Sequence, residues 1–118
     1  MVAEEGAVLG SGGLRLYAVP YGCVDLYAYD PLNRRAAVGV VVATGYRRQG
    51  YGLAMLEALR GMASETFHLH QIYADIAADN GASEAMFRKA GYTECGRFRE
   101  WVEKDGEFVD TIRMQLIL

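Results

Sequence analysis

Arg47, Gly50 and Gly52 stand where a valine-rich run gives way to a helical pattern, and together they could bind a phosphate group. The two glycines carry no Cβ, so the backbone can turn sharply there and expose its amides to a bulky ligand. Those amides would lie in the first turn of a helix, where N–H groups lack partners and the helix dipole is positive. With Arg48 adding positive charge, the segment predicts a binding site for a phosphate or pyrophosphate.

Two familiar phosphate-binding patterns do not fit this segment. Gly45 and Gly50 have the separation of a Walker A loop, but Tyr51 follows where that loop needs a lysine. A dinucleotide fingerprint fails because Met55 occupies the third glycine position and no acidic residue ends a following strand at the expected distance. A nucleotide-binding regulator built on this turn is therefore disfavoured, and ATP should cause no thermal shift.

The hydrophobic pattern before the loop predicts three neighbouring antiparallel strands. Residues 14–19 and 21–29 are strand-like, and residues 30–34 supply a turn into the third strand. The valine-rich run 38–42 is typical of a strand buried on both faces. Residues 1–13 contain little to bury and are predicted to form a flexible arm.

After the loop, the pattern predicts a helix, a strand, a second helix and a hairpin. Helical spacing follows Gly52, and residues 71–77 form the next strand. Asn80 is a good N-cap for a short helix that Gly91 would end. The Asp105-Gly106 pair is a strong hairpin signal between the last two strands. The predicted order is β-β-β-α-β-α-β-β.

Composition limits the classes of partner. The 118 residues suit one domain, and no apolar run approaches a membrane span or a signal peptide, so the cytoplasm is expected. A net charge of −3 without a basic tail argues against nucleic acid and weakly favours a cationic acceptor such as an amine. Cys23 and Cys95 are far apart and are expected to be buried small residues, while His68 and His70 lack a third metal ligand. No metal site is predicted.

Two blocks of sequence resemble the GNAT superfamily of acyl-CoA-dependent N-acetyltransferases. The first is Arg47-x-x-Gly50-x-Gly52 after the valine strand, and the second is Asn80-x-x-Ser83-x-x-Met86-Phe87-x-Lys89-x-Gly91-Tyr92. Within the superfamily, the chain looks most like the spermidine and ribosomal-protein alanine acetyltransferase branches, on the segments 33–36, 69–73 and 106–110. The resemblance implies an α+β domain over residues 14–118, with a mixed, mostly antiparallel sheet of about six strands and two helices.

The resemblance also implies a set of residues around acetyl-CoA as co-substrate. The pantetheine arm would lie along Val40, Val41 and Val42, and Asn80 and Ser83 would lie near the thioester end. The residues placed around the pyrophosphate are Arg47, Arg48, Gln49, Gly50, Tyr51, Gly52 and Leu53.

Three departures from the family pattern affect the expected reaction. Phe87 stands where much of the family has a tyrosine that protonates the departing thiolate, so the reaction should be slower or differently assisted. Ala37 replaces a glutamate of the spermidine branch, so polyamine specificity is not supported. Only thirteen residues precede Leu14, where the family usually has a further strand and two helices, so a homodimer is expected to complete the acceptor cleft.

Asp25 is a candidate base that could take a proton from an ammonium through water, although an ordinary exposed strand carboxylate is the favoured alternative. Two functions stay open at this point. One is acetyl transfer to a small-molecule amine or a peptide N-terminus by direct attack in a ternary complex. The other is a non-catalytic acyl-CoA-binding or scaffolding module derived from such an enzyme.

Overall fold

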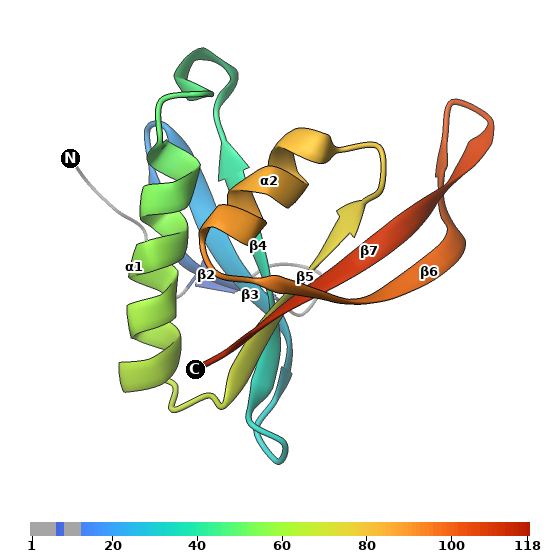
Figure 1. Ribbon diagram of the computed structural model, residues 1–118. Helices are drawn as coiled ribbons and strands as arrows, with labels where there is room; N and C mark the ends of the chain where they lie inside the picture. Colours follow the sequence, from blue (N-terminus) through green and yellow to red (C-terminus); the bar gives the residue numbers. More distant parts are fainter. Residues whose placement is uncertain (1–6, 9–12) are drawn as a thin grey trace.

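The computed structural model describes residues 7–8 and 13–118. Within these residues the strands form one seven-stranded sheet in the order β1-β2-β3-β4-β5-β7-β6 (Figure 1). The elements are β1 Ala7–Val8, β2 Leu14–Val19, β3 Gly22–Asp30, β4 Arg35–Val42, a 3₁₀ turn Thr44–Tyr46, α1 Tyr51–Glu65, β5 Gln71–Ala77, α2 Gly81–Lys89, β6 Thr93–Lys104 and β7 Glu107–Ile117. The predicted order is confirmed, with β1 as an additional short strand. Ala7 and Val8 belong to the segment predicted to be an arm, most of which lies outside the described residues.

The sheet is mixed and mostly antiparallel, as expected. The β1–β2, β2–β3 and β3–β4 pairs are antiparallel, β7 pairs antiparallel with β5 and β6, and the β4–β5 ladder is parallel. The β6–β7 hairpin extends away from the rest of the sheet (Figure 1). Its turn has Asp105 at φ 50° and Gly106 at φ 82°, which confirms the predicted Asp-Gly hairpin.

Both helices lie on the same side of the sheet (Figure 1). α1 packs on β3, β4 and α2, and the strands bury alternate residues beneath the helices, such as Ile72, Ala74 and Ile76 of β5. The opposite face of the sheet carries no helix within the described part of the chain. We call this side the open face.

The prediction that the valine strand is buried on both faces is wrong. Val38 is 2% exposed, whereas Val41 is 56% exposed. The side chains of successive strand residues point to opposite faces of the sheet. The side chain of Val41 therefore points to the open face, and that of Val38 points to the helices. A run of valines gives no sign of which face lacks a cover.

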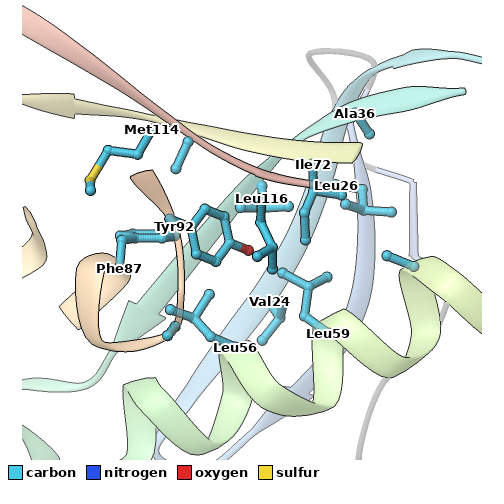
Figure 2. Close-up of a cluster of buried hydrophobic side chains, with 14 of the residues drawn as sticks. Val24, Leu26, Ala36, Leu56, Leu59, Ile72, Phe87, Tyr92, Met114 and Leu116 are labelled. Atoms are coloured by element: carbon cyan, nitrogen blue, oxygen red, sulfur yellow. The ribbon is translucent and has the colours of Figure 1, made fainter. Parts of the chain in front are cut away.

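The core lies between the helices and the sheet (Figure 2). Leu56 and Leu59 of α1 meet Val24 of β3 there, and the ring of Tyr92 lies among them with 1% of its surface exposed. Phe87 packs edge-on against Tyr92, with ring centroids 5.0 Å apart and an interplanar angle of 84°. This contact fixes the buried side of α2.

The expectation that both cysteines are buried is also wrong. Cys23 on β3 is half-buried and Cys95 on β6 is exposed. Both cysteines lie on the open face. Val24, which follows Cys23, points into the core, and Cys95 lines a pocket with other open-face residues.

None of the described helices is long and apolar enough to cross a membrane.

Candidate functional site

A gap opens between β4 and β5. Their parallel ladder joins Arg35, Ala36 and Ala37 to Gln71, Ile72 and Tyr73 and then stops. Beyond it, β4 stays paired with β3 as far as Val42, and β5 stays paired with β7 as far as Ala77. Because the two strands follow different partners, they diverge, and the facing backbone edge of β4 is left without a neighbouring strand.

A pocket of about 150 Å³ fills this gap. It is lined by Tyr27 of β3, Val38, Gly39 and Val40 of β4, Ala74, Asp75 and Ile76 of β5, and Asn80, Ser83 and Phe87 in and before α2. Consecutive residues of one strand point to opposite faces, so a pocket lined by three in a row from each strand lies between the strands. The gap therefore has walls from the helix-covered face and from the open face, and we call it the gap pocket.

The α2 side of the gap pocket is built as the sequence indicated. Asn80 caps the helix, since its Oδ1 accepts a hydrogen bond of 3.2 Å from the Ser83 N–H. Gly91 has φ 99°, which suits the predicted C′ glycine. The structure thus brings Asn80 and Ser83 together with Val40. Val41 lies on the open face and Val42 is half-buried against the core, and neither lines the pocket.

The N-terminus of α1 has the features of an anion site. Gly50 is the N-cap with φ 82°, it makes no side-chain cap hydrogen bond, and the first turn has no acidic residue. The first amide bonded back to the cap is that of Ala54, which donates to Gly50 O at 3.0 Å. The amides of residues 51–53 precede this bond, so the positive end of the helix dipole faces an exposed loop.

Gly52 has a packing role that the sequence pattern did not indicate. It is buried, and a Cβ at this position would collide with the sulfur of Met86 on α2 and crowd Val42. Gly52 therefore lets α1 approach α2 closely. Of the two glycines, Gly50 is the one whose left-handed backbone conformation requires glycine.

Side chains of the loop fold back onto its own backbone. Arg47 Nε donates to Val42 O at 3.4 Å, and Gln49 Nε2 donates to Gly45 O at 3.3 Å. Arg48 is exposed with φ 63°. The residues expected around a pyrophosphate thus surround the start of α1, with Leu53 half-buried behind it.

Three tyrosines support this loop from the side. Tyr21 stacks on Tyr51 with ring centroids 4.3 Å apart, and Tyr46 meets Tyr21 at 6.1 Å and Tyr51 at 5.7 Å. Sequence reasoning missed this cluster, because Tyr21 lies in the turn between β2 and β3, far from the loop in the chain. The cluster ties that turn to the start of α1.

Two titratable side chains line the gap pocket, and neither was singled out from the sequence. Asp75 accepts hydrogen bonds of 2.8 and 3.0 Å from Nε and Nη2 of Arg113. Burial, followed by the nearby Asp75 carboxylate, raises the pKa of Tyr27 above its ordinary value of 10.0. The Tyr27 phenol is therefore a weaker acid than that of an ordinary tyrosine, and its phenolate is a stronger base. Tyr27 and Asp75 come to one pocket where β4 and β5 diverge.

Asp25 is engaged elsewhere. It lies opposite Gly39 in the β3–β4 register and forms an ion pair with Arg15 Nε at 3.0 Å. It is not among the residues that line the gap pocket, and its role as a base stays a prediction. His68 and His70 are exposed, and no cluster of metal-binding side chains occurs in the described ranges.

The sequence is similar to those of known acetyltransferases. The model of the acetyltransferase (GNAT) domain matches residues 3–93. An N-alpha-acetyltransferase of Sulfurisphaera tokodaii is 29% identical over 111 residues, which is 90% of this chain and 62% of the relative. The putative ribosomal N-acetyltransferase YdaF of Bacillus subtilis is 26% identical over 96 residues, 81% of this chain and 52% of the relative. The chain thus spans between half and two thirds of the length of these relatives.

Solved structures share the fold. A mutant of spermidine N-acetyltransferase SpeG from Vibrio cholerae superposes with a TM-score of 0.85 at 20% identity, covering 92% of this chain and 67% of that one. A probable acetyltransferase superposes with a TM-score of 0.80 at 26% identity, covering 89% of this chain and 61% of that one. The fold expected from the two sequence blocks is confirmed.

Proposed function

Since the chain belongs to the GNAT family of acetyltransferase domains, we propose that it transfers an acetyl group from acetyl-CoA to a primary amine by direct attack in a ternary complex. The observation that carries the proposal is the gap pocket, which lies between two strands and has walls from both faces of the sheet. A thioester entering from the helix side can meet an amine entering from the open face. The two substrates then need no covalent enzyme intermediate.

The residues around the gap suit the parts of acetyl-CoA. The edge of β4 beyond Ala37 has no neighbouring strand in the ladder, so its N–H and C=O groups can pair with the amides of pantetheine. The amides of residues 51–53, with Arg47 and Arg48 beside them, supply donors and positive charge for the pyrophosphate. The proposed CoA-binding residues are Val40, Val41, Val42, Arg47, Arg48, Gln49, Gly50, Tyr51, Gly52, Leu53, Asn80 and Ser83.

In the proposed reaction, the amine nitrogen attacks the thioester carbon, a C–N bond forms and the C–S bond breaks. Backbone N–H groups of β4 would stabilise the oxyanion that develops on the carbonyl oxygen. Asp75 would hold the incoming ammonium and receive one of its protons through water before the attack. The nitrogen loses its second proton from the tetrahedral intermediate through water as the amide forms. Tyr27 would give its phenol proton to the departing thiolate and would be reprotonated by the proton that the nitrogen loses. Because burial raises the pKa of Tyr27, its phenolate takes that proton back readily.

Tyr27 would thus take over the task for which Phe87 is unsuited. Phe87 is 4% exposed, lines the pocket and packs on Tyr92, so it contributes shape and no proton. This same substitution favours the second candidate function, a non-catalytic acyl-CoA-binding module. Both functions require CoA binding, but only the enzyme releases CoA in the presence of an amine.

The acceptor is proposed to be a primary amine, either a small molecule or a protein N-terminus. Ala37 is 1% exposed and lies between Tyr27 and Tyr73 in the sheet register, so that position offers no charge to a polyamine. The two curated relatives are named for acetylation of N-termini and of ribosomal targets. These observations favour a peptide amine over a polyamine.

A homodimer is proposed as the assembled form. Trp101 and Phe108 on the β6–β7 hairpin are 65% and 60% exposed, and β6 is the outermost strand of the sheet. Unpaired strand edges and exposed aromatic side chains recruit partners. Light scattering at micromolar concentration should give twice the 13.0 kDa mass of one chain, and a mass of one chain would contradict the proposal.

The direct test of acetyl transfer measures CoA release with a panel of amines and peptide N-termini. Release above the amine-free background, together with acetylated product by mass spectrometry, supports the enzyme. Acetyl-CoA that raises the melting temperature without any release across the panel supports the binding module, because a ligand that prefers the native state stabilises it. Lack of both effects would contradict both functions.

A further inference from the structure

A second pocket, of about 330 Å³, lies on the open face beside the gap pocket. It is lined by Arg35, Gln71, Tyr73, Cys95, Arg113 and Gln115, from four different strands. Two of these side chains are guanidinium groups and none is a carboxylate. Although the whole chain is mildly acidic, the lining of this pocket carries two cationic groups, and their partners Asp30 and Asp75 lie outside the lining.

The two arginines are held to different degrees. Arg113 is fixed by its two bonds to Asp75 and by the rings of Tyr73 and Phe98, whose centroids lie 4.3 and 5.1 Å from its Cζ. Arg35 has a looser ion pair, 3.4 Å from Asp30, and half of its side chain is exposed. A charge-assisted hydrogen bond to a well-placed carboxylate is shorter than the 3.4 Å between Arg35 and Asp30. Arg35 can therefore form a stronger hydrogen bond by turning to an anionic ligand.

The spacing of the two pockets limits the ligand. Asp75 lines the gap pocket, while Tyr73 and Gln71 line the second pocket from the same face of β5. At 3.2–3.4 Å per residue, Tyr73 and Gln71 lie roughly 7 and 13 Å from Asp75 along the strand. An extended peptide advances about 3.3–3.6 Å per residue, so this distance equals about two to four residues.

We propose that the acceptor is a peptide or protein N-terminus with an acidic side chain at its third, fourth or fifth residue. The terminal amine enters the gap pocket beside Asp75, and the acidic side chain binds Arg35 and Arg113 in the second pocket. The placement of the amine rests on the proposed function. A polyamine would bring positive charge to two arginines, which this pocket disfavours.

Calorimetry with the CoA-loaded protein tests the inference without depending on turnover. The probes are peptides that are identical except for glutamate, glutamine or lysine at residues three to five. The wild type should bind the glutamate peptide about tenfold more tightly than the glutamine peptide. Arg35→Gln should remove most of this difference, because the Arg113 that remains is already bonded to Asp75. Arg60→Gln, which removes the same charge from the exposed side of α1 outside both pockets, should preserve it.

A charge exchange makes the test independent of simple loss of stability. Arg35→Glu should bind the lysine peptide in preference to the glutamate peptide. Equal binding of all three peptides by the wild type, or an unchanged preference in Arg35→Glu, would overturn the inference. Selective binding without acetylation would support this inference while contradicting the proposed enzyme, and acetylation without selectivity would do the reverse.

Discussion

Asp75 and Arg113 form two parallel hydrogen bonds of 2.8 and 3.0 Å between neighbouring strands, yet the two side chains line different pockets. Asp75 belongs to the gap between β4 and β5, and Arg113 belongs to the second pocket on the open face. This ion pair is therefore the wall that the two pockets share. A molecule that occupies both pockets would extend across it.

Asp75→Asn should lower kcat/KM for the amine by about 10²-fold, because the amide keeps the shape of the carboxylate but cannot accept a proton. Acetyl-CoA affinity should stay unchanged. The ion pair with Arg113 is partly exposed, so the free energy of unfolding should fall by no more than about 1 kcal/mol. Steady-state kinetics would check this, with Asp79→Asn as the control, since Asp79 pairs with Lys104 outside the gap. Equal losses in the two variants would contradict a role for Asp75.

Tyr27→Phe should lower kcat by about 10²-fold if the phenol protonates the thiolate. The raised pKa of Tyr27 means that the phenol keeps its proton to higher pH than an ordinary tyrosine, so the alkaline fall in wild-type kcat should begin above pH 10.0. The variant should lack that fall. Tyr29→Phe, on the same strand and 54% exposed, is the matched control. A wild-type rate in Tyr27→Phe would exclude Tyr27 as the acid.

Tyr92→Phe should raise the free energy of unfolding by about 1 kcal/mol, because the buried Tyr92 hydroxyl has no hydrogen-bond partner among the described residues. Burial raises the pKa of Tyr92, so the unfolded state loses its phenol proton first as pH rises. The folded state is therefore destabilised above the ordinary tyrosine pKa of 10.0, and the variant should lose this part of the alkaline destabilisation. Urea denaturation at neutral and alkaline pH would measure both effects. A less stable variant would show that the hydroxyl has a favourable partner.

Gly50→Ala should lower the free energy of unfolding by about 1–2 kcal/mol, because a residue with a Cβ is strained at φ 82°. It should also weaken acetyl-CoA binding, since the strain displaces the amides that begin α1. Gly45→Ala is the control from the same loop, because a Cβ there would meet no atom within 4 Å. Thermal unfolding with and without acetyl-CoA separates the two effects. Equal stability and equal stabilisation by acetyl-CoA in the two variants would exclude this role for Gly50.

The parts of the site that depend on local chemistry were predictable from the sequence. Asn80 as an N-cap, Gly91 after a helix and the Asp105-Gly106 turn each have a short-range physical reason, and the structure bears them out. The glycine loop and the second block also led to the family. These features need only a few neighbouring residues to be recognised.

The parts that depend on long-range pairing were not predictable. The valine run does not indicate that one face of its strand is uncovered, and nothing near Asp75 or Tyr27 in the sequence indicates that β4 and β5 separate beside them. The loop pattern predicts that Gly52 lets a ligand approach the backbone, whereas its missing Cβ accommodates Met86 from the other helix. The separation of β4 from β5 and the contact of Gly52 with Met86 both depend on elements that are far apart in the sequence.

Calorimetric titration of the purified protein with acetyl-CoA tests the central claim most directly, with ATP as the comparison ligand. We predict saturable heat at one acetyl-CoA per chain, weaker binding when Arg47 and Arg48 are both changed to glutamine, and no heat with ATP. A titration with acetyl-CoA that gives no saturable heat would contradict it.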